Sequence, residues 1–184
     1  MAETMIANIP PEDLRAIVRT LLATHSPTLA SSFTHTARAR LSQVNARPLP
    51  DLPTVFEKAP QSNLSAPAPG LDDVLRRVRA LYGAGMGLAS LDLLAKIVRA
   101  TWGLRWENEG VMADALAMID ADITQAIQSS KEEIEEGRVF DLATARAVAA
   151  DISQTLEGSE SDIAGWGGEF PFERAAASLV LWTI

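Results

Sequence analysis

Residues 111–136, VMADALAMIDADITQAIQSSKEEIEE, decide the fold class of this chain. Their apolar side chains recur three and four positions apart, a spacing that places them on one face of an α-helix. The members of this apolar stripe are Met112, Ala115, Leu116, Ile119, Ile123, Ala126 and Ile127. A stripe of this length, which fades into the acidic residues 132–136, predicts a long amphipathic helix that packs against other helices.

The same spacing recurs on both sides of this stretch. It predicts further helices over residues 14–22, 29–44, 71–82, 88–102, 142–156 and 172–182. Alanine and leucine, which are among the best helix formers, dominate the composition, and aromatic residues make up only 5% of it. We therefore expect an all-α fold, a compact bundle of about six to seven helices.

A proline-rich segment interrupts the helical pattern. Residues 45–69 hold six of the ten prolines, a density at which neither a helix nor a central strand persists. Leu49, Leu52, Val55 and Phe56 make the segment too apolar for a purely solvated linker, so we expect an extended strap across the helices. The predicted organisation is an N-terminal helical hairpin (1–44), this strap after the second helix, and a main helical bundle (70–184), with hairpin and bundle in one globular domain.

Composition and charge narrow the classes of function. The chain has no cysteine, which excludes disulfides and thiolate metal sites. Its net charge of −8 disfavours nucleic-acid binding, because that binding needs a basic face. Residues 1–105 carry a net +4 and residues 106–184 a net −12. With no basic, apolar start and no long apolar run, we expect no membrane span and an intracellular location, cytoplasmic or nuclear.

No motif predicts a catalytic residue, a bound metal or a cofactor. The glycine run at residues 83–87 follows a helix and lacks the lysine of a phosphate-binding loop, so it indicates a helix junction. Asp120 and Asp122 point about 200° apart on a helix and cannot share one ion, and we expect these acids to be solvated, with one of them paired with an arginine. His25 and His35 lack an orienting acid. Enzymatic activity stays open, with no residues to carry it.

Two groups of residues are the candidates for binding. The first group is aromatic: Trp102, Trp106, Trp166, Phe170, Phe172 and Trp182. These side chains either form an interface or pocket, or they plug the end of the bundle. The second group is basic and includes Arg76 and Arg79, which either face solvent or bind an acidic protein partner.

Parts of the chain resemble a known family. Residues 13–27, DLRAIVRTLLATHSP, look like the helix–His–Pro–helix start of the fungal nuclear proteasome-tethering factors, and Arg77-Val78-Arg79 and Leu116–Ile127 resemble later elements of that family. The resemblance implies a shared helical bundle and no catalytic residue. Here Ser26 separates His25 from Pro27, and the lysine-rich tail that precedes the first helix in the family is absent from residues 1–10, so the resemblance leaves the tethering activity open.

The sequence has well-formed apolar helical stripes but no group of polar side chains that would converge on one site. This pattern favours a non-catalytic helical adaptor or assembly subunit that acts through protein–protein contacts. The alternative is a small-molecule carrier or enzyme with an apolar pocket inside the bundle, lined by Tyr82, Met86, Trp102 and Met112. A third hypothesis is self-association through the apolar C-terminus, residues 175–182. The expected partner is therefore another protein or a second copy of this chain.

Overall fold

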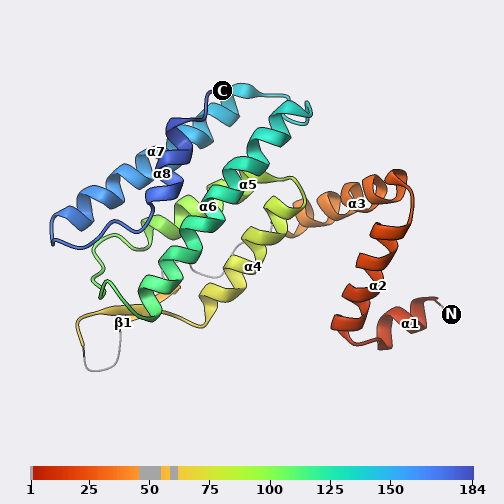
Figure 1. Cartoon of the computed structure of the whole chain (residues 1–184), viewed down its shortest axis with the longest axis horizontal. Helices are drawn as coiled ribbons and strands as arrows, with labels where there is room; N and C mark the ends of the chain where they lie inside the picture. The colour runs from red at the N-terminus through yellow and green to blue at the C-terminus, as the bar shows by residue number, and fades with distance from the viewer. Residues whose placement is uncertain (1, 46–54, 59–61) are drawn as a thin grey trace. The chain divides into compact units, whose positions relative to one another are not determined.

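The computed structural model of the chain describes residues 2–45, 55–58 and 62–184, and these contain eight α-helices and one small antiparallel sheet (Figure 1). The all-α prediction is confirmed. Each predicted helix is present, and α1 (Ala2–Asn8) is an additional helix that the apolar spacing did not indicate. The chain has two compact units, Met1–Val44 and Asn45–Ile184, called below the hairpin unit and the main unit.

The hairpin unit contains α2 (Pro11–Thr24) and most of α3 (Pro27–Asn45) in addition to α1. Pro11 starts α2 with a backbone already suited to a helix, and Glu12 and Asp13 lie near the positive end of the helix dipole. The connection to α3 is only two residues long, and Pro27 begins that helix. Neither α2 nor α3 contains a buried residue.

The main unit contains α4 (Gly70–Gly83), α5 (Gly87–Arg99), α6 (Val111–Glu135), α7 (Leu142–Ala164) and α8 (Glu173–Val180). Helix α5 contacts α4, α6 and α7, and α6 contacts α4, α5 and α8, so α5 and α6 form the central pair. The apolar stripe predicted on α6 is the centre of the core, where Leu116, Ile119 and Ile123 are fully buried. Asp141 caps α7, because its Oδ1 accepts the Ala143 N–H at 2.9 Å.

The glycine run at 83–87 is the junction between α4 and α5, as predicted. Gly87 lies so close to α6 that a Cβ atom there would come within 2.2 Å of the Ser130 backbone nitrogen. Gly85 has a positive φ of 75°, and Arg138 donates a hydrogen bond to its carbonyl oxygen at 2.8 Å. The Glu133 carboxylate accepts the Leu88 N–H at 3.2 Å near the start of α5. Side chains of α6 and of the turn after it thus hold this junction.

The proline-rich segment contributes two short strands that the sequence pattern did not predict. Strands β1 (Phe56–Lys58) and β2 (Ser65–Pro67) pair antiparallel, with Phe56 opposite Pro67. Val55 and Phe56 are buried, and β2 contacts α6. Residues 46–54 and 59–61, which include Leu49 and Leu52, lie outside the described residues, so the predicted strap stays a prediction there.

Candidate protein-binding surfaces

The aromatic residues of the main unit form two contacting pairs. The rings of Trp106 and Trp166 meet edge to face, with centroids 5.2 Å apart. The guanidinium of Arg105 lies 5.2 Å from the centroid of Trp166 on this pair. Phe170 and Phe172 also meet edge to face, at 5.8 Å. The sequence listed these aromatics among one group of candidates, but it did not show which of them are paired.

Burial separates the aromatic candidates. Phe172 is fully buried and Trp106 is nearly so, which makes Phe172 a core residue and removes it from the predicted interface. Trp166, Phe170 and Trp182 are partly exposed. Trp102 is exposed, and its ring covers Gly158 of α7, where a Cβ atom would lie 2.8 Å from Trp102 Cζ2. Trp102 and the partly exposed members are the ones available to a partner.

Three shallow clefts surround these residues and α8. The first, of about 170 Å³, includes Trp106, Asn108 and Phe170 in its lining. The second, of about 200 Å³, lies between α7 and α8 and shares Phe170. The third, of about 230 Å³, includes Ile134 and Trp182. All three are smaller than the 300–1,000 Å³ typical of small-molecule pockets, and none is lined by Tyr82, Met86, Trp102 or Met112.

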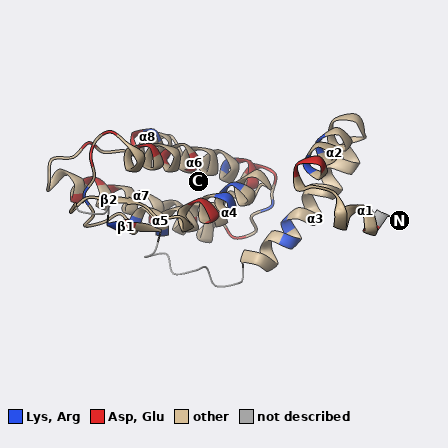
Figure 2. Ribbon diagram, turned by 90° about the horizontal axis from the view of Figure 1, so that it is seen from below, with Lys and Arg blue, Asp and Glu red and all other residues tan. Residues whose placement is uncertain are grey.

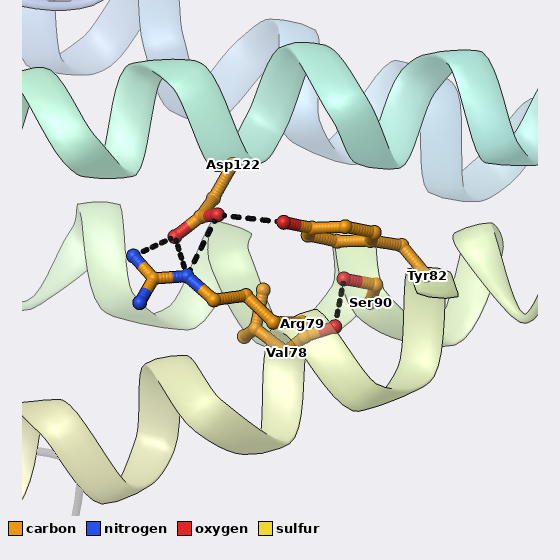
Figure 3. A network of polar contacts seen from close by, with 5 residues as sticks. All are labelled: Val78, Arg79, Tyr82, Ser90 and Asp122. Carbon is orange, nitrogen blue, oxygen red and sulfur yellow. Dashed lines mark hydrogen bonds and ion pairs between the residues drawn. The ribbon is translucent and has the colours of Figure 1, made fainter. Parts of the chain in front are cut away.

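The arginine candidates are engaged by carboxylates of the main unit. Arg76 pairs with Asp73 on the surface of α4. Arg79 binds Asp122 through two nitrogens, with Nη2 2.8 Å from Oδ2 and Nε 3.0 Å from Oδ1 (Figure 3). Tyr82 donates a further hydrogen bond to Oδ1 at 3.0 Å. These contacts tie α4 to α6 and pair Arg79 with a carboxylate of its own chain.

The same contacts shift two pKa values. The hydrogen bond to Asp122 raises the pKa of Arg79 despite partial burial. Burial, together with the hydrogen bond to Asp122, raises the pKa of Tyr82. Both groups therefore keep their protons at neutral pH, and both remain donors to the buried carboxylate. The arrangement is a bidentate ion pair supported by a phenol, which is suited to fixing two helices.

Asp120 and Asp122 are both buried, so the prediction that they are solvated is wrong, whereas the predicted pairing of one of them with an arginine is confirmed by Asp122 and Arg79. Because the two side chains point about 200° apart on α6, Asp122 faces α4 and Asp120 faces α8. Asp120 Oδ1 accepts the Ala175 N–H of α8 at 2.9 Å. Asp120 thereby serves as the N-terminal acceptor for α8, and Arg174 Nε lies 4.0 Å from its other oxygen. Neighbours distant in sequence bury these acids, and the local pattern could not show them.

Asp120 also predicts a pH dependence. Burial raises its pKa, although the Ala175 N–H and Arg174 act in the opposite direction. Because the folded pKa exceeds the unfolded value of about 3.9, its contribution to stability is complete below that pH and is lost as the pH rises through the folded pKa. Asp120→Asn keeps an oxygen acceptor and cannot ionise, so its stability relative to the wild type should increase from pH 4 to pH 7.

Urea unfolding followed by tryptophan fluorescence measures this difference, because all four tryptophans lie in the main unit. Asp120→Ala is the companion variant. It leaves the Ala175 N–H buried and unpaired, so it should be about 1–3 kcal/mol less stable than Asp120→Asn at both pH values. A difference between Asp120→Asn and the wild type that falls with pH would contradict the assignment.

The hairpin unit carries the surface that the sequence reasoning missed. Large apolar side chains of α2 and α3 are substantially exposed: Ile17 36%, Leu21 42%, Leu29 39% and Phe33 45%. These four residues with Leu14 and Val18 are called the hairpin face. Part of it is an apolar groove of about 360 Å³, lined by Leu14, Arg15, Val18, Arg19 and Phe33. The sequence showed the stripe, but not that the hairpin unit leaves it uncovered by its own residues.

The comparisons with known proteins assign no function to these surfaces. No family model matches the chain, and no curated protein or solved structure matches it. The resemblance to proteasome-tethering factors therefore stays a prediction. Within the described ranges, no three acidic or histidine side chains are grouped to hold a metal ion. Among the helices of those ranges, none has both the length and the apolar character to cross a bilayer.

Proposed function

We propose that this chain is a non-catalytic helical adaptor or assembly subunit, and that its hairpin face binds another protein chain. One observation carries the proposal: α2 and α3 are amphipathic and yet bury no residue. Short helices draw most of their stability from packing an apolar face, so a hairpin without a core needs a covering surface. Exposed apolar patches of this kind mark interaction sites.

The partner is a protein surface, which includes the surface of a second copy of this chain. The groove on the hairpin face is lined almost entirely by carbon, so its contribution to binding is apolar burial. Arg15 and Arg19 stand on one side of it, four residues apart on α2, and they favour a partner with carboxylates at its rim. The lack of cysteine is in keeping with an intracellular location, cytoplasmic or nuclear.

The double variant I17E/L21E tests the proposal, because it places two carboxylates on the hairpin face. The matched control is A16E/A23E, which adds the same charge at two exposed positions on the side of α2 away from the hairpin face. We expect I17E/L21E to lose the bound protein in affinity purification from the native source. If the partner is a second copy, the same variant should sediment as a smaller species at equal concentration.

The control variant should retain the partner and the sedimentation behaviour of the wild type. Tryptophan fluorescence should show the same unfolding of the main unit in both variants, since the hairpin unit contains no tryptophan. The proposal would be refuted if both double variants retain the same partners and the same mass in solution.

A further inference from the structure

The cleft between α7 and α8 is built as a groove for a helix. Figure 1 shows the two helices side by side, and they contact each other. One wall comes from a single face of α7, where Ser153, Leu156, Glu157 and Glu160 follow the spacing i, i+3, i+4, i+7. The other wall comes from one face of α8, where Ala176, Leu179 and Val180 follow the same rule. Phe170 adds an aromatic side chain to the lining.

The groove is apolar inside and acidic at its rim. Leu156 is buried at its base, whereas Val180 is 84% exposed beside it. Glu157 and Glu160 are exposed on the α7 wall, and neither has a basic partner among the described residues. Residues 106–184, which include both walls, carry a net charge of −12. Figure 2 shows acidic residues on the ribbon around α8.

From this complementarity we infer that the α7–α8 groove binds a basic amphipathic helix of a partner protein. Apolar side chains three and four residues apart on that helix enter the groove, and lysines or arginines beside them pair with Glu157 and Glu160. The groove presents two helices and no free strand edge, so the partner does not add a strand. Its acidic rim repels phosphates, so the partner is neither a nucleic acid nor an anionic membrane.

The volume of about 200 Å³ fits anchoring side chains rather than a whole small molecule. This inference adds a second surface to the proposed function, and it stands or falls independently of the hairpin face. The hairpin face has arginines at its rim, whereas the α7–α8 groove has glutamates. The two surfaces therefore select partners of opposite charge.

Synthetic helices of about 18 residues, long enough to be helical when alanine-rich, test the inference with the full-length chain. The probe combines alanine with leucines on one face and lysines beside them. One control peptide has glutamate for every lysine, and a second has the composition of the probe with its leucines distributed around the helix. Fluorescence anisotropy of labelled peptides measures binding. Only the probe should bind with a micromolar Kd.

Variants of the groove locate the binding site. We expect E157K/E160K and, separately, Val180→Asp to weaken binding of the probe at least about tenfold. The matched charge control is E107K/E109K, two exposed acids in the loop before α6, and the matched apolar control is Val111→Asp, which is 69% exposed at the start of α6. Both controls should change the Kd by less than about twofold.

Several results would overturn the inference. One is an equal Kd for the probe and the peptide with distributed leucines, since charge alone would then explain binding. Others are loss of binding in I17E/L21E, which would place the probe on the hairpin face, and no binding at about 1 mM. A wild-type oligomer that V180D converts to a monomer without peptide would show that a second copy fills the groove. If V180D does not fold, the comparison of E157K/E160K with its control E107K/E109K tests the inference on its own.

Discussion

Replacing Gly87 with alanine should destabilise the main unit by about 2–3 kcal/mol, although alanine is the better helix former. A Cβ atom at Gly87 would lie 2.2 Å from the backbone nitrogen and 2.5 Å from the side-chain oxygen of Ser130. Backbone cannot yield as a flexible side chain can, so α5 and α6 must move apart. These two helices form the centre of the core, and their separation loosens contacts along both.

The control for this prediction lies at the other end of the same glycine run. Gly83 ends α4, and a Cβ atom there would meet nothing within 4 Å. Gly83→Ala should therefore leave stability unchanged or raise it by about 0.5–1 kcal/mol, because alanine loses less backbone entropy on folding. Urea unfolding followed by tryptophan fluorescence separates the two variants. Equal stability of the two variants would contradict the close approach.

The glycine run shows what a local pattern can and cannot predict. The break between two helical stripes predicted the α4–α5 junction, because glycines between stripes rarely continue a helix. The reason for Gly87 lies 43 positions further on, at Ser130 of α6. No local pattern identifies that neighbour, so the sequence predicts where the helices end but not which glycine has to be a glycine.

The apolar stripes show the same limit for the candidate sites. Leu116 and Ile119 on α6 are fully buried, whereas Ile17 and Leu21 on α2 are exposed, although the spacing of each pair places both of its side chains on one helix face. Periodicity shows that a helix has an apolar face, but the covering partner decides whether that face is core or interface. The sequence therefore predicted the helices of the hairpin unit correctly but did not show that this unit does not bury their apolar face itself.

Replacing Phe172 with alanine should cost about 3–5 kcal/mol, the largest effect expected of any single substitution in the aromatic group. The side chain is fully buried at the residue preceding α8, and its ring meets Phe170 edge to face at 5.8 Å. Phe172→Leu keeps most of the volume and should cost about 1 kcal/mol. Phe170→Ala, at a partly exposed position, should also cost about 1 kcal/mol. Urea unfolding followed by tryptophan fluorescence gives all three values.

The loss in Phe172→Ala should be concentrated in α8, because a helix of eight residues has almost no stability without its docking contacts. The Ala175 amide donates a hydrogen bond to Asp120. In Phe172→Ala, hydrogen exchange at this amide should accelerate more than hydrogen exchange at the amides of α5. Since α8 forms one wall of the α7–α8 groove, Phe172→Ala should abolish binding of the basic helix although Phe172 does not line that groove. Phe170→Ala removes a lining side chain and should weaken binding without releasing α8. If Phe172→Ala unfolds the whole main unit in one transition, with equal acceleration at Ala175 and in α5, α8 is an integral part of the core rather than a docked helix.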